Sequence, residues 1–219
     1  MRTQRSWRIV HSEASLGWGG QEHRVLAELT GFRKRGAWVA LLAPENSEIF
    51  QRARVAEIKV QILDTRKFRY PFTALRLKRW LRANEVQVVN THSSRDGYVV
   101  GAASRLARVP LLIRSRHIDV EYPHPWLSRH AFTTFADHIL TTSRKITDHV
   151  KSTFHLTDDH VSTVPTGIDL NRFTPKGSKV NLFEEGTADG LSVLGMVCDF
   201  VVGRLGFSTL WRKEGFVHT

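Results

Sequence analysis

The chain has 219 residues, 41% of them hydrophobic and 24% charged, which is typical of a globular protein and excludes intrinsic disorder, collagen and coiled coil. Its single cysteine, Cys198, excludes an internal disulfide framework and a zinc site that uses several cysteines. The formal net charge of +11 predicts attraction to an anionic partner, which is a nucleic acid, a phospholipid surface or a phosphorylated small molecule.

The N-terminal segment contains no apolar stretch of about 7–15 residues, which a secretory signal requires. No run in the chain approaches the ~18 apolar residues that span a bilayer. We therefore expect a cytoplasmic protein, and we expect any membrane contact to be peripheral, at the inner membrane face.

Short apolar runs alternate along the chain with segments of helical periodicity. The apolar runs predict strands in the segments 8–15, 37–43, 59–64, 86–90, 111–117 and 138–143, and residues 161–175 close the ordered pattern. The periodic segments predict helices after the turn at Gly17–Glu22 as far as Arg35, and over 46–55, 71–84, 96–107 and the stretch that ends near Phe154. Residues 118–136 are expected to form a long aromatic connection.

The strands are continuous apolar runs, which indicates that both faces of the sheet are covered. Together with the strand–helix alternation, this predicts an α/β fold with a doubly wound parallel sheet of the Rossmann-like type. Ligands of such sheets bind beyond the carboxyl ends of the strands, near the point where the strand order reverses. The candidate segments are therefore those that directly follow strands: Gly17–Glu22, His92–Ser94 and His117–Asp119.

The first segment is rich in glycine and precedes a helix. Gly19 and Gly20 let a ligand approach the backbone, and the N–H groups of a helix start favour an anion such as phosphate. The spacing is neither that of the GxGxxG fingerprint nor that of a Walker loop. The structural alternatives are a tight turn that needs glycine and, for Glu22, a first-turn acid that interacts with the helix dipole.

The other two segments place histidines at strand ends. His117, preceded by Arg116, suits a sugar hydroxyl or a phosphate, whereas the alternative is a partly exposed histidine in an ordinary loop. His92 and Ser93 follow the fourth strand, where a serine also caps the next helix in many proteins. The chain has no GxSxG elbow, no HExxH and no DxD pair, so a serine hydrolase and a metal–nucleotide site are not expected.

Residues 66–82 carry seven basic side chains and no acidic one, with aromatic residues between them. Such stretches bind anionic membranes or nucleic acids. The alternative is a surface helix whose apolar face joins the core and whose charges are solvated. Aromatic residues between Tyr122 and Phe135 offer a further apolar contact for a lipid-linked acceptor.

Four stretches, in this order, resemble glycosyltransferase family 4: Trp18–Leu29, Val88–Gly97, Ile113–His117 and Val164–Pro175. Members of this family have the GT-B architecture of two Rossmann-like domains, and the last stretch matches the crossover between them. The resemblance implies that residues 1–175 form the acceptor-side domain, that 176–190 form a linker, and that 191–219 are a fragment of the second domain or an aberrant tail.

The resemblance also implies roles for individual residues. His117 and Glu22 are then catalytic, and His117 contacts the transferred sugar. The substrate-binding residues are then Gly19, Gly20, His92, Ser93 and Arg116. The family transfers a sugar from a nucleotide-sugar donor with retained anomeric configuration, without a cofactor and without a required metal.

The resemblance thus implies a glycosyltransferase of the hexosyltransferase type, in lipopolysaccharide or cell-surface glycan biosynthesis. The expected partners are a nucleotide sugar, a glycan or lipid-linked acceptor and an anionic membrane surface, but no nucleic acid. After Cys198 the family's pattern is lost, which predicts a truncated chain of impaired activity. The alternatives are a basic nucleic-acid- or membrane-surface-binding module without catalysis, and an inactive degenerate gene product.

Overall fold

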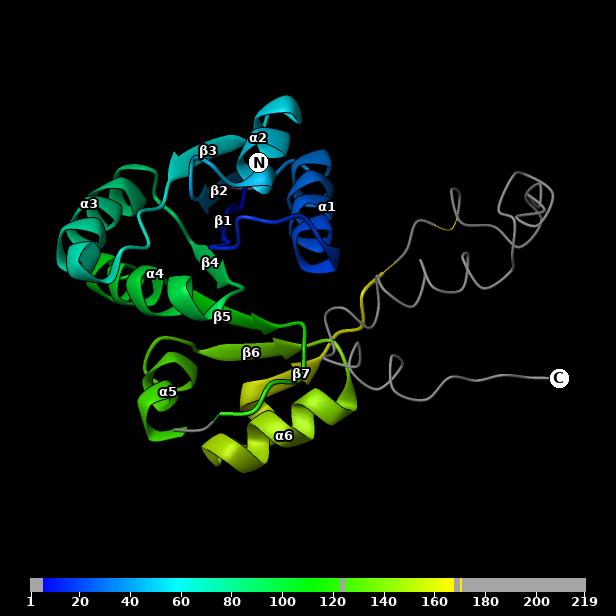
Figure 1. Ribbon diagram of the computed structural model, residues 1–219. Coiled ribbons are helices and arrows are strands. Elements are labelled where there is room, and N and C mark those ends of the chain that lie inside the picture. Colours follow the sequence, from blue (N-terminus) through cyan, green and yellow to red (C-terminus); the bar gives the residue numbers. More distant parts are fainter. Residues whose placement is uncertain (1–5, 123–124, 168–169, 171–219) are drawn as a thin grey trace, which may run out of the picture. The chain divides into compact units, whose positions relative to one another are not determined.

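The structure is a computed structural model that describes residues 6–122, 125–167 and 170 of the chain (Figure 1). Nearly all of these residues belong to one compact unit, Met1–Gly167. The expected linker at 176–190 and the expected second-domain fragment at 191–219 lie outside the described residues.

Seven parallel strands of the described part form one sheet in the order β3-β2-β1-β4-β5-β6-β7. They are β1 (Arg8–Ser12), β2 (Trp38–Ala43), β3 (Lys59–Ile62), β4 (Val88–Thr91), β5 (Leu111–Arg116), β6 (His138–Thr141) and β7 (Val161–Thr163). The chain winds from β1 towards β3 and then from β4 towards β7, so the order reverses between β1 and β4. The doubly wound parallel sheet expected from the sequence is confirmed.

Within the described part of the chain, helices cover both faces of the sheet (Figure 1). They are α1 (Gly20–Lys34), α2 (Glu48–Val55), α3 (Tyr70–Ala83), α4 (Ser94–Ala107), α5 (Pro125–Phe132) and α6 (Arg144–Phe154), with short 3-10 turns η1 (Lys67–Arg69) and η2 (Asp158–His160). In β1, Ile9 packs with α1 and α2, whereas Val10 packs with α3 and α4. Burial of successive residues on opposite faces explains why the strands read as continuous apolar runs.

A third core cluster joins α5 and α6 to β6 and β7. Phe132 and Phe154 stack with ring centroids 4.2 Å apart, and Tyr122 meets Phe154 edge-on at 4.9 Å. The segment 118–136, expected to be a long aromatic connection, contains the helix α5, which the sequence analysis did not predict. A helix of eight residues has too few turns to show a clear apolar period among so many aromatic side chains.

Local signals at the helix ends agree with this architecture. The Ser47 and Ser143 hydroxyls accept hydrogen bonds from the first turns of α2 and α6, and Gly36 takes a φ of 85° in the turn after α1. Within the described residues, none of the helices has the length and apolar character that crossing a bilayer requires.

Candidate functional site

The segments expected to form the site meet at the carboxyl edge of the sheet. β1, β4 and β5 are neighbours in the sheet, so the residues at their ends lie side by side. Because the strand order reverses between β1 and β4, this edge is where doubly wound sheets bind their ligands. The histidines of two expected segments come together here, and a third histidine joins them.

Three histidine rings form a hydrogen-bonded line across this edge: His11 from β1, His92 after β4 and His117 after β5. His92 Nδ1 lies 2.8 Å from His117 Nε2, and His92 Nε2 lies 2.9 Å from His11 Nδ1. The rings are stacked, with centroids 5.1 Å apart for His92 and His117 and 4.9 Å apart for His92 and His11. His11 and His92 are 2% and 1% exposed, whereas His117 is half-buried, so the line opens outward at His117.

Burial lowers the pKa of all three histidines. The pKa falls to about 3 for His11 and to about 4 for His117, in each case first through burial and then through the positive charge of Arg24. The pKa of His92 lies well below 6.5, first through burial and then through its two histidine neighbours. All three rings are therefore neutral at pH 7, with one N–H and one free lone pair each.

An ion pair on α1 closes the inner end of the histidine line. Glu28 Oε2 lies 3.8 Å from His11 Nδ1, and Glu28 Oε1 accepts a hydrogen bond of 2.6 Å from Arg24 Nε. Arg24 Nη1 also donates to the Val164 carbonyl and to Thr166 Oγ1, both at 3.1 Å. The line is thus tied to the segment that follows β7.

The same inner end contains a set of atoms of the kind that bind metal ions. His11, Glu28 and His92 each offer one such atom, and these atoms lie within 4.8 Å of one another. Two nitrogens that share a tetrahedral zinc are about 3.3 Å apart, because each Zn–N bond is about 2.0 Å. The observed 2.9 Å between His11 and His92 is instead a direct hydrogen bond, and the Arg24 guanidinium beside Glu28 opposes a second cation.

The glycine segment leads from the carboxyl edge into α1. The Gly19 N–H donates to Glu22 Oε2 at 2.7 Å, so the Glu22 carboxylate caps the helix start. A side chain added at Gly20 would meet nothing within 4 Å, which leaves the first turn of α1 open to a ligand. Glu22 is buried and occupied by this cap, as the structural alternative for a first-turn acid expects.

A family model, Glycosyltransferase Family 4, matches residues 18–172. The chain belongs to glycosyltransferase family 4. The resemblance carried by the four motifs is therefore confirmed. No curated protein matches the chain.

Solved structures agree with this family 4 assignment at the level of the fold. A glycosyltransferase from Rickettsia africae superimposes with a TM-score of 0.64 at 12% identity, over 90% of this chain and 50% of its own. Anabaena HepE in complex with UDP gives 0.63 at 14% identity, over 77% and 47%. The lipopolysaccharide outer core galactosyltransferase WaaB gives 0.59 at 16% identity, over 74% and 46%. The family 4 chain thus spans about half the length of these proteins.

Two buried acids at the switch point of the family 4 chain were missed by the sequence analysis. Glu13 follows β1 directly, is 0% exposed and accepts hydrogen bonds from the Ser15 N–H, at 2.9 Å, and from the Gln21 side chain. Burial, followed by the negative charge of Asp96, raises the pKa of Glu13 to about 8, so this carboxyl is protonated at pH 7. An acid that directly follows a buried strand at the switch point is a signal that could have found it.

Asp96, the second of these acids, shapes the His92–Ser93 turn. It accepts hydrogen bonds from Ser12 Oγ at 2.6 Å, from the His92 N–H at 3.1 Å, and from both the N–H and the hydroxyl of Ser93 at 2.9 Å. Ser93 is therefore held at the start of α4, as a capping serine is. The serine–x–x–acid spacing from Ser93 to Asp96 is a signal that could have found this arrangement.

Arg116 does not join the histidine line. Side chains of β5 alternate: Ser115 bonds to Asn90 at 3.0 Å, whereas the Arg116 guanidinium lies 5.7 Å from the ring centroid of Tyr122. Tyr122 packs with α5 and α6, so Arg116 is buried towards that layer. Its assignment as a substrate-binding residue remains a prediction.

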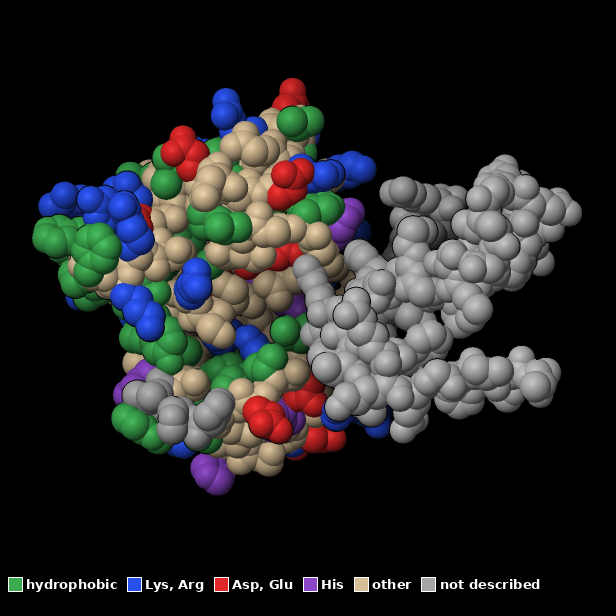
Figure 2. Space-filling view, viewed as in Figure 1, with side chains coloured by type: hydrophobic (Ala, Val, Ile, Leu, Met, Phe, Trp, Pro, Cys, Tyr) green, Lys and Arg blue, Asp and Glu red, His purple; other side chains and the backbone are tan. Residues whose placement is uncertain are grey.

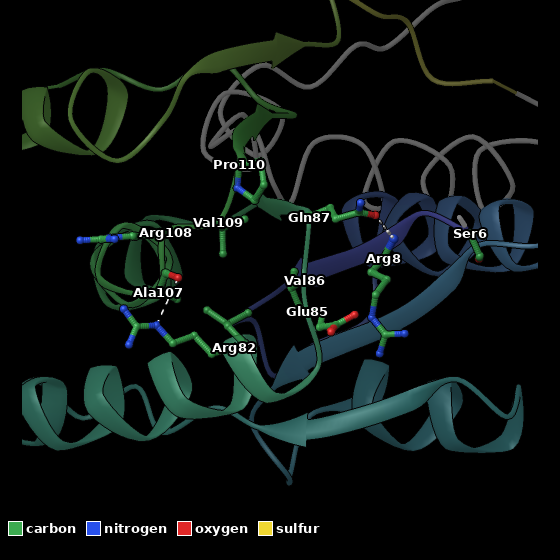
Figure 3. A pocket seen from close by; sticks show the side chains of 11 residues that line it. Ser6, Arg8, Arg82, Glu85, Val86, Gln87, Ala107, Arg108, Val109 and Pro110 are labelled. Carbon is green, nitrogen blue, oxygen red and sulfur yellow. Dashed lines mark hydrogen bonds between the residues drawn. The ribbon is translucent and has the colours of Figure 1, made fainter. Parts of the chain in front are cut away.

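The opposite edge of the sheet carries a hollow of about 500 Å³ (Figure 3). It is lined by residues at or just before the starts of β1, β4 and β5, including Arg8, Glu85 and Gln87. Because α/β sheets bind ligands at their carboxyl ends, this amino-edge hollow is a poor candidate for the site of the family 4 chain.

The basic–aromatic surface comprises η1 and the first half of α3. Phe68 and Phe72 are 74% and 76% exposed, and Leu75 is half exposed. Side chains of Arg69 and Arg76 lie among them and, with Phe68 and Phe72, line a shallow hollow of about 400 Å³. In Figure 2, hydrophobic and basic side chains gather together over the α3 region.

Proposed function

We propose that this chain is the acceptor-side lobe of a glycosyltransferase that moves a hexose from a nucleotide sugar to a glycan or lipid-linked acceptor with retained anomeric configuration. The observation that carries the proposal is the pairing of His92 and His117 at the switch-point edge of a family 4 chain. The open first turn of α1 at Gly20 supports it. The similar structure of HepE contains UDP, which supports a nucleotide-sugar donor. The similar protein WaaB is a lipopolysaccharide outer core galactosyltransferase, which supports a cell-surface glycan product.

The residues at the carboxyl edge suit a glycosyl transfer in which the sugar and the departing diphosphate develop opposite charges and no strong base is needed. The departing diphosphate needs oriented N–H donors, which Gly20 and the start of α1 would supply, because the Gly19 N–H is bonded to Glu22. His117 would contact the transferred sugar, and His92 and Ser93 would lie on the acceptor side. Because His117 is neutral at pH 7, it would act on a sugar hydroxyl through hydrogen bonds and not as a cation. The proposal uses no cofactor and no metal ion.

The basic–aromatic surface supplies the proposed contact with a membrane. Exposed Phe68 and Phe72 would enter the interface of an anionic bilayer, and Arg69 and Arg76 would meet its phosphates. Since α3 begins on the side where β3 ends, this surface lies towards the edge that holds the histidines. A lipid-linked acceptor would then approach from the cytoplasmic membrane face.

A binding experiment with the purified chain tests the proposed function. Histidine side-chain resonances are followed by NMR while UDP-glucose, UDP-galactose or a lipopolysaccharide core oligosaccharide is added. We expect the resonances of His117 and His92 to shift, and we expect His117→Ala to weaken binding about tenfold or more. A second assay follows transfer of radiolabelled sugar from the same donors, and we expect any transfer to be lost in His117→Ala. The anomeric configuration of the labelled product tests retention.

Nucleic-acid binding is the alternative function that this experiment must exclude. Steep, salt-dependent binding of DNA or RNA at micromolar affinity, with no response of the histidines to sugars, would overturn the proposal in favour of a binding module. A matched variant, Glu57→Gln, changes an exposed residue away from the edge and should leave sugar binding unchanged.

A further inference from the structure

The outer end of the histidine line has one ring nitrogen without a partner in the described part of the chain. His117 Nε2 is bonded to His92, and no hydrogen bond from a described residue reaches His117 Nδ1. His117 is also the only half-buried member of the three described histidines in the line. Its Nδ1 is therefore the atom that the line offers to a ligand at the carboxyl edge.

Hydrogen-bond matching restricts the three neutral rings to two arrangements. Each N···N contact needs one donor and one acceptor, and each neutral ring has one of each. If His92 carries its proton at Nδ1, it donates to His117 Nε2 and accepts from His11 Nδ1, so all three rings carry the proton at Nδ1. If His92 carries it at Nε2, all three carry it at Nε2. The tautomer of His11 thus determines the tautomer of His117.

The ion pair at the inner end selects between these arrangements. Glu28 Oε2 lies 3.8 Å from His11 Nδ1, and this carboxylate attracts a proton at that nitrogen. Arg24 holds Glu28 through a bond of 2.6 Å, and Arg24 is itself anchored to Thr166. The Glu28 carboxylate, held in place by Arg24, therefore favours the arrangement in which every ring carries its proton at Nδ1.

We propose that His11, His92 and Glu28 are positioning residues that set the tautomer of His117, so that it presents an Nδ1–H donor to a sugar oxygen at the carboxyl edge. This use of the donor rests on the proposed function, whereas the tautomer itself does not. The arrangement matches a general rule for histidine, in which the partner of one ring nitrogen decides the state of the other. It also gives the buried His11, which would contact no substrate, a defined role.

The tautomer can be read directly in the ligand-free chain. Two-bond 1H–15N correlation spectra at pH 7 distinguish a protonated ring nitrogen from an unprotonated one. We expect His11, His92 and His117 all to carry the proton at Nδ1, which is the minor form of a free imidazole in water. In Glu28→Gln, which keeps the shape but removes the charge, we expect His117 to move to a mixture or to the Nε2–H form.

A matched control separates this effect from a general loss of structure. Glu48 on α2 forms an i,i+4 pair with Arg52, as Glu28 does with Arg24, but it lies outside the line. Glu48→Gln should leave the His117 tautomer unchanged. If Glu28→Gln unfolds, His11→Phe serves as a second variant. It keeps a ring of similar volume and should likewise remove the preference of His117 for the Nδ1–H form. A cooperative thermal unfolding transition at pH 7 would show that each variant is folded.

The outcomes separate the tautomer proposal from the proposed function. A His117 ring that carries its proton at Nε2 in the native chain, or that does not respond to Glu28→Gln and His11→Phe, overturns the tautomer proposal and leaves the proposed function standing. An Nδ1–H form that responds as expected supports it. If that form is found but UDP-glucose and core oligosaccharide leave His117 unmoved, the line sets the tautomer and the proposed sugar contact fails.

Discussion

Glu13 shows how a single residue at the carboxyl edge takes its chemistry from its surroundings. Its side chain lies in the loop between β1 and α1, fully buried, and it ties Ser15 to Gln21. A charged carboxylate there would face Asp96 without water to screen the repulsion. The loop that leads to Gly20 is therefore built around an uncharged acid.

Replacement of Glu13 by Gln should stabilise the protein at alkaline pH. The folded pKa of about 8 exceeds the ordinary pKa of 4.5 for a glutamate side chain, so the unfolded chain loses this proton first and the free energy of unfolding falls between about pH 4.5 and pH 8. Gln has no proton to lose, and Glu13→Gln should be more stable than the native chain at pH 9 by on the order of 2 kcal/mol. Urea titrations at pH 5 and pH 9 measure this difference.

The exposed residue Glu57 provides the control for this measurement. Glu57→Gln should change the free energy of unfolding by less than about 0.5 kcal/mol at either pH. Equal stability of Glu13→Gln and the native chain at pH 9 would contradict the burial of a neutral carboxyl at this position.

At the scale of elements, two helices carry interior glycines in different surroundings. In α4, a side chain added at Gly101 would stand 2.5 Å from the Phe135 Cβ, which cannot move aside as the end of a flexible side chain can. In α1, a side chain at Gly31 would meet only the end of the exposed Arg35 side chain, at 3.3 Å. Gly101 is thus needed for close packing of α4, whereas Gly31 is not.

The two Gly→Ala substitutions should therefore have opposite effects. Alanine favours a helix over glycine by about 1 kcal/mol, so Gly31→Ala should be neutral or stabilise the fold by up to that amount. Gly101→Ala should lower the free energy of unfolding by about 1–3 kcal/mol, because overpacking outweighs the gain in propensity. Chemical denaturation of the pair measures both. A stabilising Gly101→Ala would show that α4 can shift away from Phe135.

Helix α3 has two apolar faces with different partners. Leu77 and Leu81 are buried in the core, as the solvated-helix interpretation of residues 71–84 expects. Phe72 and Leu75, together with Phe68 from η1, form a second apolar face that is exposed among basic side chains. The proposed membrane contact therefore concerns the second face only.

Polar substitution of this second face should weaken vesicle binding while leaving the fold intact. Burial of one Phe side chain is worth about 1.5–3 kcal/mol, so the double variant Phe68→Ser and Phe72→Ser should bind phosphatidylglycerol vesicles at least about tenfold more weakly. Val55→Ser, which changes an equally exposed apolar residue on α2, should not. Vesicle sedimentation is the measurement. Equal binding by all three proteins would show that this surface is merely solvated.

At the scale of the whole molecule, the buried histidines and the buried acid impose opposite pH dependences. The folded pKa values of the histidines lie below the unfolded value of 6.5, so their contribution to stability is present above pH 6.5 and is lost as the pH falls towards 4 and 3. The contribution of Glu13 is lost in the other direction, as the pH rises to about 8.

The protein should accordingly be most stable near pH 6.5. Below that pH, three histidines that take up protons on unfolding give a slope of up to about 4 kcal/mol per pH unit. The melting temperature should fall steeply from pH 6 to pH 4.5, and His11→Phe should reduce the slope by about a third. A melting temperature that is flat over this range would contradict the burial of neutral histidines.

The order of strands and helices, the parallel doubly wound sheet and the family could be read from the sequence alone, as could the sheet edge at which the candidate site is expected. These features follow from local periodicity, from turn residues and from contiguous motifs such as Trp18–Leu29, which need no long-range information. Even here the short helix α5 was missed, because eight residues show too little period.

Which side chains meet, and in which protonation state, depends on the folded structure as a whole. The contact of His11 with His92 joins residues 81 positions apart, and it exists because β1 pairs with β4 in a particular register. The protonated Glu13 and the neutral histidines depend on how completely the folded chain removes water from them. Desolvation and strand register arise from the packing of the whole chain, so no local stretch of sequence reveals them.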